Sequence, residues 1–181
     1  MKGITVFRIG HRKKRDPRLS THVALAARAF GAGKMLFSGD NDPGLVSSIE
    51  RVSSSWGGTF KAQHVKSWRR FLTDWNISGK SVQLTMYGLN VYDVVGEIRS
   101  CDQDLLVIIG GQKVPREVYE LVDWNVSITN QPHSEVSALA VFLHILLDGD
   151  EFRIQYPDAR NSIIPSLRGK RVSRSSSLPF S

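Results

Sequence analysis

Three short segments combine glycine, proline and small polar residues in the manner of ligand-binding loops. They are LTMYGLN at residues 84–90, GGQKVP at 110–115 and TNQPHSE at 129–135. Glycine lets backbone amides and carbonyls approach a ligand closely, and loops on a rigid scaffold carry much of the binding chemistry of proteins. In the third segment, polar side chains precede an almost wholly apolar stretch, and there are more of them than a helix N-cap needs. The pattern favours a ligand site over a capped helix with solvated neighbours.

The basic residues gather in two clusters, which favours a polyanionic partner. The chain carries 24 Lys and Arg against 17 Asp and Glu, a net charge of +7. One cluster occupies residues 8–18, and the other, at 64–71, interleaves its cations with Trp68 and Phe71. Cations beside rings that can stack on bases are typical of RNA-binding surfaces, although a solvated loop and an amphipathic helix would show the same composition. The cations that we expect to contact RNA are Arg12, Lys13, Lys14, Lys66, Arg69 and Arg70.

Several familiar catalytic and metal-binding motifs do not occur in the chain. GGQK at 110–113 lacks the spacing of a Walker phosphate loop, and no Gly-x-Gly-x-x-Gly is present. Ser134 lies between His133 and Glu135, but no Gly-x-Ser-x-Gly elbow surrounds it, so a hydrolase triad is not indicated. The five histidines show no metal-ligand spacing, and we predict no metal site. His144, within the apolar stretch, is expected to be a hydrogen-bonded core histidine.

Length and composition fit one domain inside the cell. A chain of 181 residues that is 41% apolar can fill one core. The single cysteine, Cys101, excludes an intrachain disulfide and favours a reducing compartment. The apolar run within 138–147 is too short to cross a bilayer, and the first residues lack the apolar stretch of a signal peptide. We therefore expect a cytoplasmic protein that does not associate with membranes.

Strand-like and helix-like segments alternate along the chain. Strands are expected at 3–9, 34–37, 59–65, 81–88, 104–111 and 124–128, and helices at 19–32, 43–56, within 64–71, at 91–100, after Pro115 and at the apolar stretch up to 147. This alternation predicts an α/β fold, a mainly parallel sheet with helices on both faces. Ligands of such sheets bind beyond the carboxyl ends of the strands, where the three loops would lie. The Ser-rich residues 173–181 are expected to be a disordered tail.

The three loops, in this order and at these separations, resemble the cofactor-binding half of SPOUT-superfamily RNA methyltransferases. The segments that carry the resemblance are LTMYG (84–88), IGGQKVPREVY (109–119) and NVSITNQPHSEVSALA (125–140). More narrowly, the chain is similar to the archaeal family of tRNA cytidine 2′-O-methyltransferases that modify T-loop position 56, which residues 8–32 and RGKRV (168–172) also resemble. The resemblance implies one SPOUT domain, residues 1–172, with a deep trefoil knot in its carboxyl-terminal part, about residues 80–148.

The resemblance also implies that S-adenosylmethionine is the cofactor and that the three loops hold it. A methyl donor with an adenine edge, a ribose and an amino-acid tail needs backbone groups and side-chain donors beside an apolar wall. The polar cluster followed by Val136, Leu139 and Ala140 supplies both. The implied cofactor-binding residues are Leu84, Gly110, Gly111, Gln112, Lys113, Val114, Ile128, Thr129, Asn130, Gln131, Pro132, His133, Ser134 and Glu135.

Catalysis would draw on the amino-terminal basic segment. A ribose 2′-hydroxyl is a poor nucleophile, so methyl transfer requires in-line positioning and help in losing a proton. Ribose-methylating members of the superfamily use an arginine of this motif, but Leu25 stands near that position here. We expect Arg18, with Arg15 as the second choice, to anchor the substrate phosphate and lower the pKa of the hydroxyl, and we name His22 as a candidate base.

A homodimer and two alternative functions complete the expectations. Superfamily members are typically homodimers with sites built from both subunits, and the apolar helix at 136–147 could face a partner or its own core. One alternative is a SPOUT methyltransferase that acts on another RNA or on a base, which would draw on different acceptor-side residues. The other is a non-catalytic RNA-binding module, which would explain the charge but leave three decorated loops without a ligand.

Overall fold

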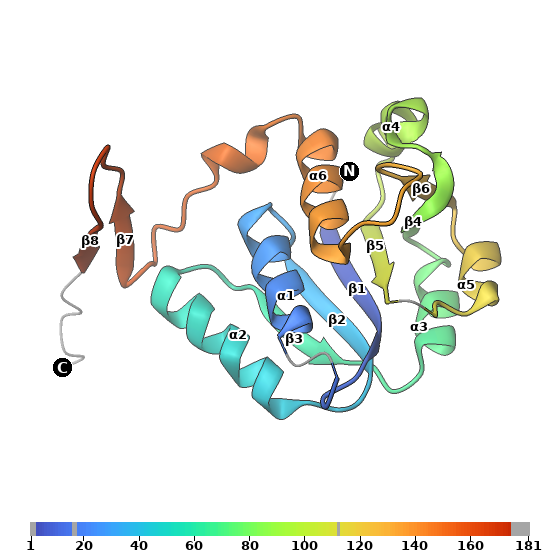
Figure 1. Cartoon of the computed structure of the whole chain (residues 1–181), viewed down its shortest axis with the longest axis horizontal. Coiled ribbons are helices and arrows are strands. Elements are labelled where there is room, and N and C mark those ends of the chain that lie inside the picture. Colours follow the sequence, from blue (N-terminus) through green and yellow to red (C-terminus); the bar gives the residue numbers. More distant parts are fainter. Residues whose placement is uncertain (1–2, 16–17, 112, 175–181) are drawn as a thin grey trace.

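Six parallel strands form a central sheet with helices on both of its faces (Figure 1). The structure is a computed structural model, which describes residues 3–15, 18–111 and 113–174. The strand order is β3-β2-β1-β5-β4-β6, and every neighbouring pair is parallel. The predicted α/β class and parallel sheet are therefore confirmed.

The elements follow one another much as the sequence pattern predicts. The strands of the sheet are β1 (Ile4–His11), β2 (Lys34–Gly39), β3 (Lys61–His64), β4 (Lys80–Asn90), β5 (Leu105–Gly110) and β6 (Trp124–Ser127). The helices are α1 (Leu19–Ala29), α2 (Pro43–Trp56), α3 (Trp68–Trp75), α4 (Val91–Ser100), α5 (Arg116–Leu121) and α6 (Glu135–Leu147). Helix α1 ends at Ala29 and not at the predicted residue 32, because Phe30 leaves helical geometry and Gly31 has a φ of +87°.

Each face of the sheet carries its own apolar cluster, because alternate residues of a strand point to opposite faces. In β5, Val107 and Ile109 pack on the face covered by α1, α2, α4 and α6. Leu106 and Ile108 pack on the other face, against α3 and α5. The central strand is therefore buried on both sides, which explains its continuous apolar sequence LLVIIG.

Strand β4 contains an irregularity that shapes the first predicted loop. Leu84 and Leu89 both lie opposite Val126 of β6, so residues 85–88 leave the ladder between them. Gly88 is required at this point, since a Cβ atom there would lie 2.5 Å from backbone atoms of Asn125. The strand thus bulges and returns to the same neighbour.

Helix α6 packs one side against the sheet and leaves the other partly exposed. Its buried residues include Leu139, Phe142 and Leu143, whereas 41% of Val141 is exposed. The expected core position of His144 is wrong: half of its side chain is exposed, and its Nδ1 lies 2.5 Å from a carboxylate oxygen of Glu151. Among the described residues, no helix has both the length and the apolar character that a membrane span requires.

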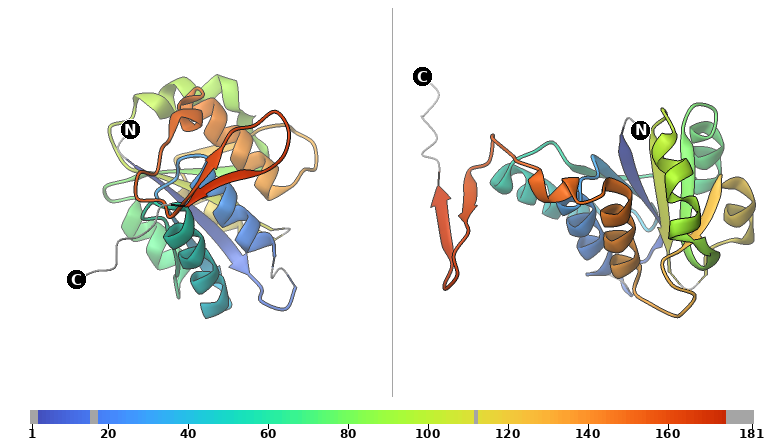
Figure 2. Two further views of the ribbon diagram at one scale, coloured as in Figure 1. Left: turned by 90° about the vertical axis from the view of Figure 1, so that its left-hand side faces the viewer. Right: turned by 90° about the horizontal axis from the view of Figure 1, so that it is seen from above.

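The carboxyl-terminal residues form a hairpin that the sequence pattern did not predict. After a 3₁₀ helix, η1 (Asp150–Arg153), strands β7 (Asn161–Ile164) and β8 (Arg171–Arg174) pair in antiparallel fashion. Figure 2 shows this hairpin projecting away from the main sheet. Ser173 and Arg174, which we placed in the terminal tail, are strand residues because they pair with Ser162 and Asn161. The rest of the predicted tail, 175–181, lies outside the described residues.

Two glycines at the carboxyl ends of β1 and β2 provide a matched test of the fold. Gly10 (φ +79°) and Gly39 (φ +103°) both have left-handed backbones, but a Cβ on Gly10 meets no atom within 4 Å, whereas one on Gly39 would lie 2.3 Å from the carbonyl oxygen of His11. Gly10→Ala should lower the free energy of unfolding by about 1 kcal/mol through backbone strain alone. Gly39→Ala should cost about 3 kcal/mol or more, as measured by urea denaturation. Equal losses would show that the β1–β2 contact relaxes freely.

Candidate functional site

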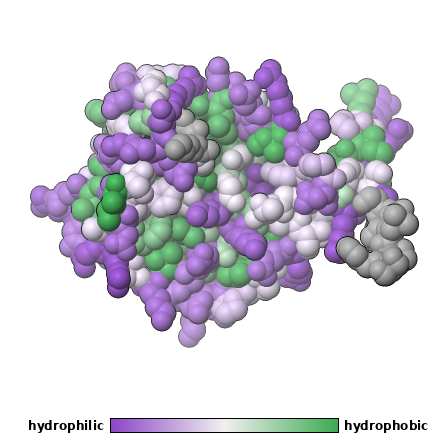
Figure 3. Space-filling view, turned by 180° about the vertical axis from the view of Figure 1, so that it is seen from behind, coloured by the Kyte–Doolittle hydropathy of each residue, from purple (hydrophilic) through white to green (hydrophobic). Residues whose placement is uncertain are grey.

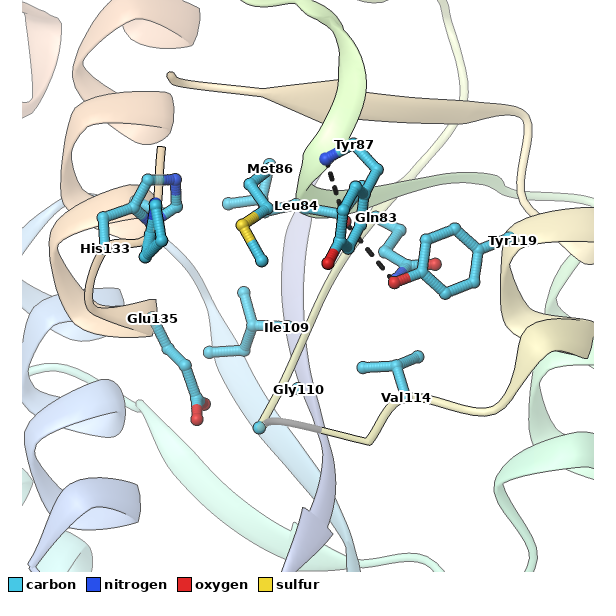
Figure 4. A pocket seen from close by; sticks show the side chains of 14 residues that line it. Gln83, Leu84, Met86, Tyr87, Ile109, Gly110, Val114, Tyr119, His133 and Glu135 are labelled. Atoms are coloured by element: carbon cyan, nitrogen blue, oxygen red, sulfur yellow. Dashed lines mark hydrogen bonds between the residues drawn. The ribbon is translucent and has the colours of Figure 1, made fainter. Parts of the chain in front are cut away.

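A pocket opens at the carboxyl ends of β4 and β5, where the three predicted loops meet (Figure 4). Its volume is ≈ 430 Å³, within the usual range for small-molecule sites. Residues from β4, β5, α5, α6 and the loop before α6 line it. Parallel strands end at the same edge of a sheet, so segments far apart in sequence share one cavity.

Half of the predicted cofactor-binding residues line this pocket. They are Leu84, Gly110, Gly111, Val114, Pro132, His133 and Glu135. The residues that do not line it are Lys113, Ile128, Thr129, Asn130, Gln131 and Ser134. Gln112 lies outside the described residues.

Two of the non-lining polar side chains hold the loops in place. The Oγ atom of Ser134 accepts a hydrogen bond from the backbone N–H of Val136 at 3.3 Å and caps α6. The Nδ2 atom of Asn130 donates to the carbonyl oxygens of Met86 and Gly88, at 2.8 and 3.4 Å. The third loop is thus fastened to the first, and part of the polar cluster at 129–135 has a structural role.

Seven further residues line the pocket that were not named individually from the sequence, although Thr85, Met86 and Tyr87 lie within the first predicted loop. They are Gln83, Thr85, Met86, Tyr87, Ile109, Tyr119 and Ala138. Figure 4 shows Tyr119 of α5 facing β4, where its hydroxyl lies 3.5 Å from Oγ1 of Thr85. The Thr85 hydroxyl in turn accepts a hydrogen bond from the N–H of Tyr87 at 3.4 Å. Helix α5 therefore closes a side of the cavity that the loop sequences alone did not indicate.

Gln83 is the most informative of the missed residues. Its side chain is only 1% exposed, and neither its amide nitrogen nor its amide oxygen has a hydrogen-bond partner within the part of the chain that the structure describes. Buried amides are nearly always hydrogen-bonded, so a group with both atoms open beside a cavity is available to a bound molecule or to an ordered water. The signal in the sequence was a glutamine between the apolar residues Val82 and Leu84 of a predicted strand.

A buried ion pair borders the pocket. Arg8, on β1, is 1% exposed and its Nε atom lies 3.2 Å from Oε2 of Glu135, the first residue of α6. The position of Glu135 at a helix N-terminus further stabilises its negative charge. Sequence reasoning counted Arg8 only within the basic cluster. Buried charges that border a cavity are frequent at functional sites, and this pair ties the first strand to the third loop.

The amino-terminal basic segment, residues 8–18, leaves strand β1 at a buried histidine, His11. The Nδ1 atom of His11 lies 2.7 Å from Oγ of Ser20, at the start of α1, and its Nε2 atom lies 3.3 Å from Oδ2 of Asp42. The other carboxylate oxygen of Asp42 caps α2 by accepting the N–H groups of Gly44 and Leu45. The side chains on both sides of His11 thereby fix where the basic segment leaves β1 and where it enters α1.

The pKa of Asp42 is the one clearly lowered carboxyl pKa among the described residues. Burial alone would raise this pKa, but the hydrogen bonds from the Leu45 N–H and from His11, together with the charge of Lys13, outweigh burial. The ammonium of Lys13 lies 3.9 Å from Oδ1 of Asp42. The carboxylate is therefore held in its charged form.

The three predicted catalytic residues are exposed and do not line the pocket. Arg15 and Arg18 lie near the end of the basic segment, where Arg18 is the N-cap residue of α1. His22 lies on the exposed side of α1. The segment follows β1 and so lies at the same edge of the sheet as the pocket. Within one chain, these three side chains are therefore not part of the pocket wall.

The second basic cluster is only partly available to RNA. Trp68 and Phe71 are partly buried and pack against the apolar cluster on the α3 side of the sheet, so each ring has only part of its surface free. Arg69 donates to Glu117 of α5 at 2.8 Å, and Arg70 pairs with Asp74 on its own helix. Lys66 is exposed.

The described residues include no group of three or more His, Cys, Asp or Glu side chains that could hold a metal ion.

Comparison with known proteins identifies the family. A family model described as "tRNA ribose 2′-O-methyltransferase, aTrm56" matches residues 56–173, more than half of the chain. The chain belongs to this family. The resemblance to SPOUT-superfamily RNA methyltransferases is therefore confirmed.

Curated relatives share the match over nearly their whole length. The chain is 54% identical over 170 residues to the tRNA (cytidine(56)-2′-O)-methyltransferase of Methanopyrus kandleri, covering 93% of this chain and 95% of the relative. It is 48% identical over 174 residues to the protein of that name from Thermococcus kodakarensis, covering 94% and 97%. The match therefore includes the three loops.

Solved structures support the fold. The TrmH/SpoU tRNA modifying enzyme of A. aeolicus superposes with a TM-score of 0.58 at 16% identity, covering 84% of this chain and 78% of that one. The SpoU methyltransferase AviRb of Streptomyces viridochromogenes, solved in complex with AdoMet, gives 0.54 at 18% identity and covers 80% and 56%. At these identities the likeness shows that the chain has the TrmH/SpoU type of fold.

The lowered pKa of Asp42 makes a prediction about stability and pH. A lowered pKa in the folded state stabilises the protein above the pKa of the unfolded state, and this contribution is lost as the pH falls through the folded value. Asp42→Asn retains a helix-capping side chain but not the charge. It should be less stable than the parent at pH 7, by about 1 kcal/mol, and the difference should shrink below about pH 4. Thermal unfolding of both proteins at pH 7 and pH 3.5 measures the difference; a gap that is independent of pH would assign no role to the charge.

Proposed function

We propose that this protein transfers the methyl group of S-adenosylmethionine to the ribose 2′-hydroxyl of cytidine 56 in tRNA. The observation that carries the proposal is that a family of tRNA ribose 2′-O-methyltransferases matches the very segments whose loops line one pocket. A non-catalytic RNA-binding module would leave that pocket without a purpose. Relatives 43–54% identical over nearly the whole chain all carry the cytidine-56 name, which favours this acceptor over another RNA or a base.

The pocket fits a methyl donor that contains a nucleoside. Leu84, Ile109 and Val114 provide apolar surface for an adenine ring, and Gly110 exposes backbone groups to its edge. The open amide of Gln83 offers both a donor and an acceptor in a buried position. When bound, S-adenosylmethionine supplies a methyl group on a positively charged sulfur that is already activated for transfer. The chain itself must bind and orient this donor, and exclude water from it.

The deep trefoil knot at about residues 80–148 is part of the proposal. Two observations support it: the likeness to TrmH/SpoU folds, and the fastening of the third loop to the first through Asn130. A loop threaded in this way would hold the pocket open at a fixed width. The assignment of residues 1–172 to a single SPOUT domain is part of the same proposal.

In this proposal, the basic segment and the start of α1 position and activate the ribose hydroxyl that accepts the methyl group. The hydroxyl must be aligned with the donor and must lose its proton as the new bond forms. Arg18, with Arg15 as the alternative, would bind the phosphate next to the reacting ribose and stabilise the developing negative charge of the oxygen. His22, one turn further along α1, would accept the proton.

We further propose that the active form is a homodimer. Arg15, Arg18 and His22 are exposed outside the lining of the pocket of one chain, so a second copy that brings its basic segment over the pocket would complete the site. Tyr87 and Leu89 in the first loop and Tyr92 at the start of α4 are 75%, 63% and 74% exposed, an apolar surface suited to such a contact. The cytoplasmic location remains a prediction.

The function is tested by incubating the purified protein with cofactor labelled on its methyl group and with unmodified archaeal tRNA. Nuclease digestion and mass spectrometry should locate the label on the ribose of cytidine 56. A tRNA in which this nucleotide is a 2′-deoxycytidine should accept none. Label on a base, or at another position of the tRNA, would contradict the assignment.

Two adjacent glycines test the cofactor loop. A Cβ on Gly110 would lie 2.4 Å from Cγ2 of Val114 and displace this wall of the pocket, whereas one on Gly111 would meet Glu135 at an ordinary 3.5 Å. Gly110→Ala should weaken S-adenosylmethionine binding about tenfold or more, a loss of about 1.4 kcal/mol. Gly111→Ala serves as the control and should weaken it much less. Titration calorimetry measures the affinity of each variant. If both variants bind S-adenosylmethionine as tightly as the parent protein does, this loop is not part of the cofactor site.

The catalytic assignment is tested in the basic segment. Arg18→Ala should lower the single-turnover rate of methylation by about two orders of magnitude, the scale for loss of one electrostatic stabiliser, with cofactor affinity unchanged. Arg18→Lys should restore little, because an ammonium lacks the planar two-donor fork. Arg15→Ala should mainly weaken tRNA binding. The reverse order of rate losses would exchange the two roles, and normal rates in both variants would place catalysis elsewhere.

A further inference from the structure

The segment from residue 160 to 174 holds most of the net charge of the protein. Its basic residues are Arg160, Arg168, Lys170, Arg171 and Arg174, and it has no acidic residue. The whole chain carries 24 basic and 17 acidic residues, which leaves 19 against 17 outside this segment. Such a local excess of one sign favours a partner of the opposite sign.

These five cations have no side-chain partner among the residues that the structure describes. All five are exposed, and none of their side chains makes a hydrogen bond or an ion pair within the described ranges of the chain. Cations elsewhere differ: Arg69 pairs with Glu117, Arg116 with Glu120 and Arg153 with Asp150. An arginine or lysine without an internal partner can neutralise a phosphate and displace a cation that is condensed on a nucleic acid, so these side chains are the most available for that purpose.

The hairpin is anchored at its base and uncovered beyond it. The Tyr156 hydroxyl donates to the carbonyl oxygen of Arg28 at 3.0 Å, and the Arg28 guanidinium lies over the Tyr156 ring at 4.4 Å. Asn161 donates to the carbonyl oxygen of Ser55 at the end of α2, at 3.3 Å. Beyond this point Leu167 is 97% exposed. A two-stranded hairpin that stands alone is only marginally stable in water, so a partner that covers it would also order it.

The hairpin and the pocket lie at opposite ends of the molecule. In Figure 1, β7 and β8 extend from one side, whereas β4, β5 and α5, which line the pocket, are at the other. Figure 3 shows hydrophilic and hydrophobic residues side by side on the projecting hairpin. A molecule that touches both ends must be extended, as a tRNA is.

The distribution of the charges over the hairpin favours RNA over a second protein chain. Paired residues share a face, so Arg174 lies beside Asn161 on one face and Arg171 beside Ile164 on the other. A protein partner on either face would have to supply a carboxylate to each arginine that it buries, because this chain supplies none there. Phosphates would pair with the cations on both faces, while Ile163 and Val172 contact ribose and base surfaces.

We propose that the β7–β8 hairpin is an arm that binds the sugar-phosphate backbone of the tRNA at a distance from the methylated nucleotide. The proposal rests on the tRNA substrate of the proposed function and adds a second contact surface to it. The arm contributes to substrate binding and not to the chemical step.

The test compares two variants that each remove two positive charges. Arg168→Gln with Arg171→Gln alters the arm, and Arg116→Gln with Arg153→Gln alters arginines on the body that are already paired. The arm variant should bind full-length tRNA several-fold more weakly, and the slope of its log affinity against log salt should fall by about 1.5 to 2, since each phosphate contact releases close to one counterion. The control should keep the parental slope. A short hairpin RNA of the T arm alone should bind the arm variant and the parent alike.

Three further readouts decide the outcome. S-adenosylmethionine affinity and the single-turnover rate at saturating tRNA should be unchanged in the arm variant. An arm variant with the parental salt slope would overturn the proposal. If sedimentation also shows that this variant is a monomer while the parent is a dimer, the arm docks on a second copy of the chain. If the parent protein methylates no tRNA while the arm variant still loses tRNA affinity, the proposed function fails and the arm remains.

Discussion

The ion pair between Arg8 and Glu135 joins the first strand of the chain to the start of its last long helix, and the site is organised around this bond. The pair fixes the N-terminus of α6 against the middle of the sheet. The loop that leads into α6 is held at that end, and Asn130 then fastens it to the bulge of β4. Removal of Arg8 would leave the carboxylate of Glu135, whose side chain is only 15% exposed, without this cationic partner, and the loss of one partner of a desolvated ion pair is destabilising. Loss of Arg8 would therefore disturb the pocket from a residue that does not line it.

Parallel strands impose a second constraint, since they bring every strand-to-helix loop to one edge. The pocket follows β4 and β5, and the basic segment follows β1 at the same edge. Donor and acceptor of a transfer reaction can then be held by separate loops that share only the scaffold. The contacts of His11 with Ser20 and Asp42 fix the start of the basic segment separately from the ion pair that borders the pocket.

Sequence reasoning was most successful where local pattern and tertiary structure agree. The apolar run LLVIIG and the Asp42-Pro43 helix start need only nearby residues to be interpreted, and both were predicted correctly. The lining contributed by Gln83 and Tyr119 was missed, because it depends on which strands are neighbours and on a helix that folds back over them. The packing of Trp68 and Phe71 against the core was not predicted, since composition shows an aromatic beside a cation but not the side of the helix that faces the core. The hairpin was missed because its two short strands carry no strong pattern and become visible only as a pair.

The bulge of β4 has a thermodynamic consequence for ligand binding. Residues 85–88 form a loop whose two ends pair with the same residue of β6 and whose carbonyl oxygens at Met86 and Gly88 are already engaged by Asn130. The conformational entropy of this loop is therefore lost when the protein folds and not when a ligand arrives. A small molecule that binds against this preformed wall orders little more of the chain, so its affinity reflects the contacts that it makes. Its binding should change the heat capacity by an amount set by the apolar area that it covers.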